Sequence, residues 1–370
     1  HDYPIGFVRW TEQRNFEAVL DMMASGVLDI KRLISHRVPF ENAPSAYELL
    51  TDDSSALGIL LTYNHSTASR HIDTVRLKAA PTVANGKATL GVIGAGNYAS
   101  RVLVPSLKAA GASLQSIVSS GGTSAAVHGQ KLGFTSAATD ADKIFSDQQI
   151  DAVIVATRHD SHAQLCIRAL RAAKHVFVEK PLALSLGEVD ELQAVYNDYP
   201  KHLMVGFNRR FAPQTQTMKR LMGSVNEPKT IIMVMNAGPI AANHWTQDSE
   251  QGGGRITGEA CHHIDLMRFL IGHPIVSVQA RRIGNSNHLE ITDDKAVIVL
   301  GFADGSFGTI HYLANGGGIF PKERVEVFTA GRTLRLDNFL KLRGFNWPGF
   351  RKQNLWRQDK GQIACAAAFV

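Results

Sequence analysis

Residues 94–99, GAGNYA, follow the spacing G-x-G-x-x-A, which is typical of loops that bind phosphate. An apolar run, 89–93, precedes the loop, and a helical pattern over 98–110 follows it. In this setting glycine allows a tight turn, and a pyrophosphate can lie against the N-terminus of the helix. The alternative is a glycine turn that packs helix on strand and binds nothing. We expect a bound dinucleotide to be contacted here by Gly94, Gly96, Asn97 and Tyr98.

The next predicted strand ends in the run SSGG at 119–122, and no Asp or Glu occurs between Gly96 and Asp140. An acidic side chain at this place would bond the ribose 2′-hydroxyl of NAD and repel the 2′-phosphate of NADP. Small hydroxyls leave room for that phosphate, with Lys131 or His128 as a cation nearby. The sequence therefore predicts NAD or NADP, with a lean toward NADP. The residues expected beside the ribose are Ser119 and Ser120.

A lysine directly follows the predicted strand 175–178, in the motif Glu179-Lys180-Pro181. Ligands bind at the carboxyl ends of the strands in open α/β sheets, so this ammonium can reach a nicotinamide ring and a reacting oxygen. Its charge would stabilise negative charge on that oxygen while a hydride moves. The alternative is a solvated surface lysine with a neighbouring ion pair.

The stretch 252–266, GGGRITGEACHHIDL, places histidines and carboxylates on one predicted helix. His262 is three residues from both Glu259 and Asp265, and residues three apart share a helix face. A His with a carboxylate partner acts as a general acid or base near neutral pH. Zinc is the rival reading, but adjacent histidines diverge by about 100° on a helix, so we predict no metal site. A His satisfied inside a core is the structural alternative.

The order of strand and helix patterns predicts two main domains of different class. Alternating strands and helices argue for an α/β Rossmann domain with a parallel sheet. Further along, strands separated by tight turns and one strong helix argue for an α+β domain with a largely antiparallel sheet. The expected parts are a small block at 1–63, a linker at 64–86, the Rossmann domain at 87–206, the substrate domain at 207–340 and an incomplete C-terminal segment at 341–370.

Composition narrows the classes of function further. The chain has 370 residues, of which 44% are hydrophobic and 19% charged, as in packed globular proteins. The net charge is +6 without a basic run, which favours small anionic ligands over nucleic acid. No apolar stretch approaches about 18 residues, so we expect no membrane span. Three scattered cysteines and a start without a signal pattern favour a cytoplasmic location.

Five motifs in order resemble the Gfo/Idh/MocA family of NAD(P)-dependent oxidoreductases over about residues 88–340. They are GAGNYA, TRHDSHA at 157–163, KHV and EKP within 174–181, GFNRRF at 206–211, and the GGG…His…Asp helix. The resemblance implies hydride transfer to or from a hydroxyl or carbonyl of a sugar, cyclitol or sugar nucleotide. It also implies that Lys180 and His262 are the catalytic pair. Further residues implied are Thr157, His162, Glu179 and Lys180 for the cofactor, and Asn208, Arg209, Glu259 and Asp265 for the substrate.

One departure from the family pattern leaves a second function open. Many dehydrogenases of the family have Asp four residues before the His, as D-x-G-x-H, whereas this chain has Gly258 there with Glu259 beside it. Glu259 is displaced but longer, and would have to orient His262 instead. The alternative is a non-catalytic NADP-binding sensor of the same fold. We favour the enzyme because both Lys180 and His262 are retained.

Two resemblances bear on partners. Residues 3–16 and 33–47 resemble the C-terminal tail of zinc-type, medium-chain alcohol dehydrogenases, although an unrelated N-terminal extension is the alternative. We therefore expect an upstream dehydrogenase-like domain in a longer polypeptide, acting on the same substrate or a successive product. The Gfo/Idh/MocA resemblance implies a homo-oligomer that pairs through the open sheet of the second domain.

Overall fold

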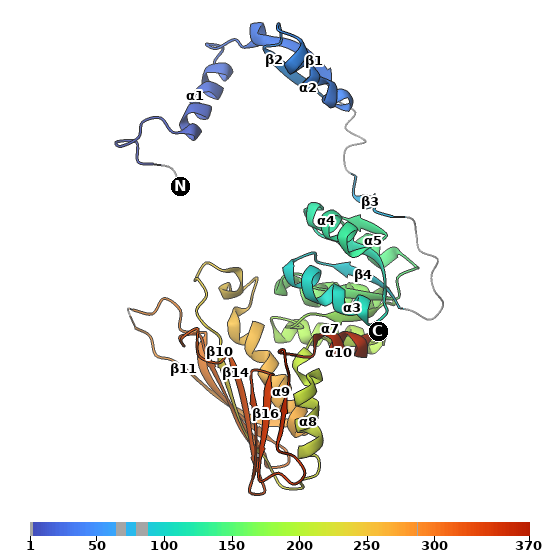
Figure 1. The fold of residues 1–370 in the computed structure, drawn as a ribbon, viewed down its shortest axis with the longest axis vertical. Coiled ribbons are helices and arrows are strands. Elements are labelled where there is room, and N and C mark those ends of the chain that lie inside the picture. The colour runs from blue at the N-terminus through green and yellow to red at the C-terminus, as the bar shows by residue number, and fades with distance from the viewer. Residues whose placement is uncertain (1–2, 64–71, 79–87, 287) are drawn as a thin grey trace. The chain divides into compact units, whose positions relative to one another are not determined.

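The computed structural model describes residues 3–63, 72–78, 88–286 and 288–370. The chain divides into two compact units, 1–72 and 73–370 (Figure 1). The second unit holds two sheets with separate cores, and it contains every residue predicted to take part in chemistry.

The N-terminal unit is built on one β-α-β crossover. Its two strands pair in parallel, and the helix between them makes the connection that parallel strands require. Val38 and Ala46 are its buried apolar residues within the described part, so this block has little core of its own. The elements are α1 (Glu12–Ala24), η1 (Lys31–Leu33), β1 (Ile34–Pro39), η2 (Phe40–Asn42), α2 (Ala43–Asp52) and β2 (Gly58–Thr62).

A seven-stranded sheet forms the first domain of the second unit, in the order β3-β6-β5-β4-β7-β8-β9. All neighbours are parallel except β3, which is antiparallel to β6. The strands are β3 (Thr74–Arg76), β4 (Thr89–Ile93), β5 (Ser113–Val118), β6 (Ser136–Ala138), β7 (Ala152–Val155), β8 (His175–Val178) and β9 (Leu203–Val205).

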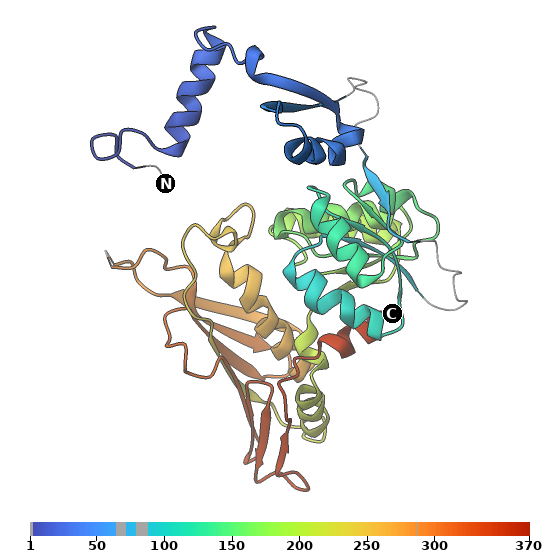
Figure 2. The same cartoon turned by 45° about the horizontal axis from the view of Figure 1, so that its top comes forward.

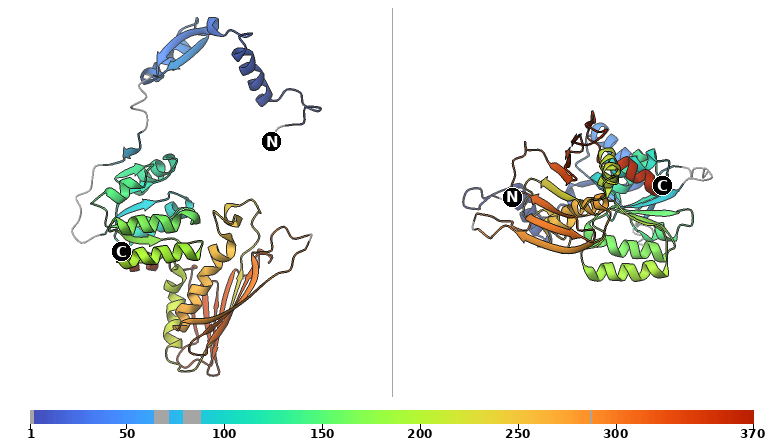
Figure 3. Two further views of the ribbon diagram at one scale, coloured as in Figure 1. Left: turned by 180° about the vertical axis from the view of Figure 1, so that it is seen from behind. Right: turned by 90° about the horizontal axis from the view of Figure 1, so that it is seen from below.

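Helices cover both faces of this sheet (Figure 3). One core contains residues of α3 and α4, and the opposite core contains residues of α5, α6 and α7. The predicted Rossmann domain is therefore confirmed. The helical elements are η4 (Ala99–Leu103), α3 (Val104–Ala109), α4 (Thr123–Leu132), α5 (Asp142–Ser146), η5 (His159–Ser161), α6 (His162–Arg171) and α7 (Leu186–Asp198).

Strand β3 lies inside the segment predicted as a linker. Of that segment, 64–71 and 79–86 lie outside the described residues. Thr74 pairs with Ala138 and Arg76 with Ser136, so β3 covers the edge of β6 instead of linking domains. An uncovered edge strand leaves backbone donors and acceptors unpaired. Three exposed residues carry no hydrophobic period, which is why the sequence pattern did not reveal this strand.

The second domain is an eight-stranded sheet in the order β11-β12-β13-β10-β14-β15-β16-β17. Only β10 and β13 pair in parallel, so the predicted largely antiparallel sheet is confirmed. The strands are β10 (Thr230–Asn236), β11 (Ile275–Arg282), β12 (Lys295–Phe302), β13 (Phe307–Leu313), β14 (Glu323–Thr329), β15 (Arg332–Asp337), β16 (Lys341–Phe345) and β17 (Lys352–Asn354).

Two long helices, α8 and α9, pack against one face of this sheet (Figure 2). The sequence predicted one strong helix here and missed α8, because its buried face includes the polar Gln214 and Thr215. The helical elements are η6 (Asn208–Phe211), α8 (Pro213–Met222), η7 (Trp245–Gln247), η8 (Ile256–Ala260), α9 (Cys261–Ile271) and α10 (Gln362–Phe369).

The C-terminal segment, predicted to lie outside the substrate domain, packs on both domains. Strands β16 and β17 extend the second sheet, and Leu342 lies in its core. Helix α10 returns to the Rossmann domain, where Phe369 packs edge-on against Phe177 with ring centroids 5.5 Å apart. Among the described helices none has the length and hydropathy to cross a membrane.

Candidate active site

The glycine loop begins where β4 and β5 end together. The Gly94 amide donates to the Val118 carbonyl at 2.9 Å, and Gly94 has φ +107°. A Cβ on Gly94 would lie 2.2 Å from the Ala156 carbonyl oxygen, so only glycine fits. A Cβ on Gly96 would meet no atom within 4 Å, which leaves its backbone open to a ligand. This exposed loop, which also carries Asn97, fits the pyrophosphate of a dinucleotide.

The serines after β5 have different surroundings. Ser119 Oγ accepts a hydrogen bond from the Ala125 amide at 3.1 Å inside α4, whereas Ser120 is exposed. The cations expected nearby, His128 and Lys131, are on α4, about 8 and 12 Å along its axis from its first residue.

A cavity of about 510 Å³ joins the strand ends of the Rossmann domain to the second domain. Lys180 and His262 both line it, although they come from distant parts of the chain. Nine predicted residues line it in all: Tyr98, Thr157, His162, Glu179, Lys180, Asn208, Arg209, Glu259 and His262. The sequence did not single out its other lining residues, which are Ala156, His159, Trp245, Lys322, Lys360 and Gln362.

Lys180 follows the C-terminal end of β8, and contacts of Lys180 and of the next residue, Pro181, hold this loop. Lys180 Nζ donates to the Gly258 carbonyl at 2.8 Å, across the boundary between the domains. His162 Nδ1 lies 2.7 Å from the Pro181 carbonyl, and since a carbonyl only accepts, this nitrogen carries the proton. His162 Nε2 lies 3.3 Å from the Thr157 carbonyl. The neutral ring has one N–H, so its hydrogen bond to Pro181 ties the start of α6 to the loop after β8, while Nε2 only lies near the Thr157 carbonyl.

Glu179 is a buried carboxyl beside Lys180. Burial raises the pKa of Glu179 to about 7, against the opposing effects of the Lys180 charge and a hydrogen bond from the Tyr98 hydroxyl. Burial and the Glu179 carboxylate likewise raise the pKa of Tyr98. The Glu179 carboxyl therefore changes charge near neutral pH, next to the proposed reacting centre.

His262 is a buried, neutral imidazole. Burial, followed by the charges of Arg209 and Lys180, holds its pKa well below the ordinary 6.5. Its Nδ1 has no hydrogen-bond partner among the described residues, and the ring packs edge-on against Phe207. Nδ1 is enclosed, so the cavity that His262 lines can meet only the other edge of the ring, and a neutral imidazole has one nitrogen lone pair that can accept a proton.

Neither predicted carboxylate orients His262. Asp265 pairs with Arg210 instead, with Arg210 Nε 3.0 Å from Asp265 Oδ2, and it lines a different cavity. The expectation that Asp265 contacts substrate in the main cavity is therefore not met. Its helix face turns toward η6, where Arg210 supplies a stronger partner than an imidazole.

Glu259 does line the main cavity, but three other donors hold it. Tyr312 Oη donates to Glu259 Oε2 at 2.5 Å, Arg255 Nη2 to the same oxygen at 3.0 Å, and Lys322 Nζ to Oε1 at 3.3 Å. Burial acts to raise the pKa of Glu259, but Tyr312 and the charges of Lys322 and Arg255 outweigh it and lower the pKa. Glu259 thus stays ionised as a hydrogen-bond acceptor.

Two residues that line the cavity, Arg209 and Lys360, belong to a buried ion cluster around Glu323. Arg209 Nε donates to Glu323 Oε2 at 2.7 Å, and Lys360 Nζ to Oε1 at 2.5 Å. Asn208 Nδ2 donates to the Lys360 carbonyl at 2.7 Å, which joins this cluster to the C-terminal segment. Lys360 could not be predicted, because the segment that carries it was expected to lie outside the substrate domain.

His159 is a further histidine of the cavity that the sequence offered only as part of TRHDSHA. Its Nδ1 donates to the Gly252 carbonyl at 2.8 Å, and its ring meets Trp245 edge-on at 4.8 Å between centroids. Burial is the main cause that lowers the pKa of His159 to about 4. Its position at the end of β7 is the signal that could have identified it.

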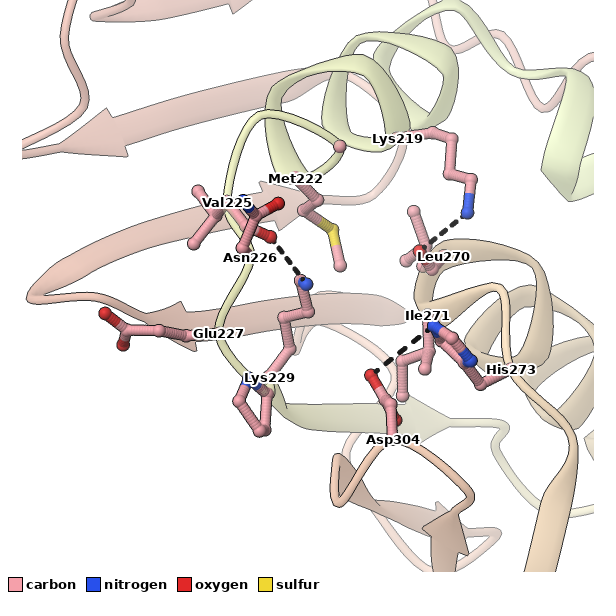
Figure 4. A pocket seen from close by; sticks show the side chains of 12 residues that line it. Lys219, Met222, Val225, Asn226, Glu227, Lys229, Leu270, Ile271, His273 and Asp304 are labelled. Carbon is pink, nitrogen blue, oxygen red and sulfur yellow. Dashed lines mark hydrogen bonds and ion pairs between the residues drawn. The ribbon is translucent and has the colours of Figure 1, made fainter.

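Another cavity, of about 320 Å³, lies between the ends of α8 and α9 (Figure 4). Lys219 Nζ donates to the Leu270 carbonyl at 3.1 Å, and Lys229 Nζ to the Val225 carbonyl at 2.9 Å. These lysines satisfy carbonyls near helix ends, a structural role. None of the residues predicted for the site lines this second cavity. Among the described residues no group of three His, Cys, Asp or Glu is arranged to hold a metal.

Comparison with protein families accounts for both domains of the second unit. Residues 88–207 match the family described as oxidoreductase family, NAD-binding Rossmann fold, and residues 222–333 match the GFO/IDH/MocA C-terminal domain. Together these matches cover more than half of the chain. The protein belongs to the Gfo/Idh/MocA family of oxidoreductases.

Curated relatives give narrower similarities. The chain is 29% identical to myo-inositol 2-dehydrogenase of Thermotoga maritima over 56% of its length and 63% of that protein. It is 30% identical to scyllo-inositol 2-dehydrogenase (NAD(+)) of Bacillus subtilis over 49% of this chain and 54% of that protein. The chain thus spans under two thirds of these relatives. Levoglucosan dehydrogenase in complex with NADH and levoglucosan shares the fold, with a TM-score of 0.68, 21% identity, and coverage of 76% and 89%.

Proposed function

We propose that this protein is an NAD(P)-dependent dehydrogenase or reductase acting on a hydroxyl or carbonyl group of a sugar, cyclitol or sugar nucleotide. The observation that carries the proposal is that Lys180 and His262 line one cavity at the strand ends where the glycine loop lies. The named activities of relatives, on inositols and levoglucosan, support the class of substrate.

Lys180 and His262 would have different roles at the reacting oxygen of the substrate. NAD(P), when bound, supplies or accepts the hydride. The Lys180 ammonium donates one hydrogen bond to the Gly258 carbonyl and has two further N–H groups. These would donate to the substrate oxygen and stabilise its developing charge. The neutral His262 would take the hydroxyl proton during oxidation and return it during reduction.

The cofactor would lie along the strand ends of the Rossmann domain. The absence of an acidic residue after β5 leaves room for a 2′-phosphate, which supports a lean toward NADP. The comparison of kcat/KM with NADPH and NADH tests this. The residues that would hold it are Gly94, Gly96, Asn97, Tyr98, Ser119, Ser120, Thr157, His162, Glu179 and Lys180.

A dinucleotide sensor is the second candidate function, favoured by the missing carboxylate partner of His262. A panel of inositols, levoglucosan and sugar nucleotides, each with NAD and NADP, separates the two. The enzyme produces a change in nicotinamide absorbance that Lys180→Met abolishes. A sensor binds NADPH or NADH with no change for any member of the panel.

The open face of the second sheet supports a homo-oligomer. Phe307 and Phe328 both pair with Thr230 and therefore share a face, opposite the face that packs on α8 and α9. They are 50% and 40% exposed, as expected of a surface that pairs with another copy. In sedimentation, a smaller species for Phe307→Lys than for wild type would support this interface. The same sedimentation coefficient for both proteins would contradict it.

The N-terminal unit supports a role in a larger protein. Its crossover has few buried apolar residues, as expected of a part that completes another domain, and the family match begins only at residue 88. We keep the proposal that it belongs to a dehydrogenase of the medium-chain type. Kinetics of fused and separated halves test it: a rate advantage for the fusion supports the proposal, and equal rates oppose it.

A further inference from the structure

His159 presents one free ring nitrogen to the main cavity. The Gly252 carbonyl fixes the proton on Nδ1, so in the neutral ring the lone pair is on Nε2. Nε2 makes no hydrogen bond within the described residues, and it is not one of the enclosed polar atoms that lack a partner. The free edge of this buried ring therefore opens to the cavity that His159 lines.

Gly258 is what allows the ring to lie there. A Cβ at position 258 would be 2.9 Å from His159 Cε1 and 3.4 Å from its Nδ1. Any side chain at 258 would compete with the imidazole for this space. The ring is further fixed by Trp245 and by the Gly252 carbonyl, so its orientation is determined from three sides.

The same glycine also holds Lys180, whose Nζ donates to the Gly258 carbonyl. The positive charge of Lys180 is felt at His159, since it contributes to the lowered pKa of that ring. Both side chains lie against Gly258, the ammonium on its carbonyl and the imidazole over its α-carbon, and both line the same cavity. A donor and an acceptor that share Gly258 as a neighbour suit two adjacent oxygens of one small ring molecule.

We propose that His159 is a substrate-binding residue whose Nε2 accepts a hydrogen bond from the hydroxyl next to the one that reacts. This inference rests on the proposed function and deepens it: the substrate must carry a free vicinal hydroxyl. Because the contact exists before and during hydride transfer, its loss raises KM more than it lowers kcat.

The test pairs enzyme variants with substrate analogues. The probes are the best polyol of the panel and its analogue lacking the hydroxyl next to the reacting carbon. For His159→Phe, which keeps the ring against Trp245, we expect kcat/KM to fall roughly 10- to 100-fold on the polyol. On the deoxy analogue we expect the variant and wild type to agree within about threefold, and His159→Gln to restore part of the lost activity.

Arg158→Met is the matched control for the domain junction. Arg158 is exposed and does not line the cavity, yet its Nη1 contacts Gln251 at 2.6 Å beside the His159 contact. We expect this variant to leave discrimination between the polyol and its deoxy analogue unchanged. Equal losses for His159→Phe on both compounds overturn the proposal, as does loss of discrimination in Arg158→Met.

A binding measurement separates this inference from the proposed function. Calorimetry of the same two compounds with protein saturated by NADH needs no turnover. If the protein binds the polyol more tightly than the deoxy analogue, loses this preference in His159→Phe, and turns over neither compound, the His159 contact is supported and the dehydrogenase proposal is overturned. Turnover without that dependence overturns the His159 contact alone. If the polyols neither bind nor react, both proposals fail.

Discussion

Lys180 donates to the Gly258 carbonyl at 2.8 Å, so the lysine that follows β8 is positioned by a peptide of the second domain. Because the acceptor is a backbone oxygen, Lys180 is held without any side chain at position 258. The Gly258 carbonyl accepts the hydrogen bond from Lys180, and the His159 ring fills the space that a side chain at position 258 would occupy. The two domains therefore share the construction of the site.

Replacement of Gly258 by Ala tests this shared construction. The new Cβ forces the His159 ring to move, and we expect kcat/KM to fall about tenfold or more without loss of folding. Gly187→Ala is the control, because a Cβ there meets no atom within 4 Å. Full activity of Gly258→Ala, with an unchanged melting temperature, would show that the ring position does not matter.

The charge of Glu179 predicts a dependence of stability on pH. Its pKa is about 7 in the folded protein against an ordinary 4.5, so the folded state binds the proton more tightly. This contribution to stability is complete below pH 4.5 and is lost as the pH rises through 7. Glu179→Gln removes the effect, so the free energy of unfolding of the variant relative to wild type should rise by up to about 3 kcal/mol over that range.

Urea titrations of wild type and Glu179→Gln at several pH values from 4.5 to 8.5 measure this difference. Glu250→Gln, at an exposed position away from both sheets, is the control and should shift the difference little. A difference between Glu179→Gln and wild type that stays constant with pH would contradict the raised pKa.

Much of the fold could be predicted because its elements carry strong local signals. The helix 123–132 and the strands 295–302 and 307–313 lie where the apolar periods place them. By contrast, the buried face of α8 includes the polar Gln214, and all three residues of β3 are exposed. The spacing of apolar residues therefore predicts neither element.

The site was predicted in outline for the same reason. Motifs next to strand ends must meet at one edge of a parallel sheet, so Thr157, Glu179 and Lys180 came together as expected. Hydrogen-bond and ion-pair partners that come from distant parts of the chain could not be predicted from the spacing of residues in the sequence. Asp265 has the helical spacing to reach His262 but binds Arg210, and Lys360 arrives from the C-terminal segment.

The cluster around Glu323 predicts a large effect on stability. This carboxylate is 1% exposed and is held by Arg209, Lys360 and His263, the last at 3.5 Å. Glu323→Gln leaves buried cations without a counter-charge, which typically costs about 3–5 kcal/mol. Chemical denaturation measures the loss. A cost below about 1 kcal/mol would mean that water, not Glu323, compensates these cations.

The catalytic pair is tested most directly by a double-mutant cycle on Lys180 and His262. Each of Lys180→Met and His262→Phe should lower kcat/KM by at least about a hundredfold, while NADH still binds. Because both groups act on one oxygen, the double variant should lose little more than the worse single variant. Full turnover by Lys180→Met, or losses that multiply independently, would contradict a shared reaction centre.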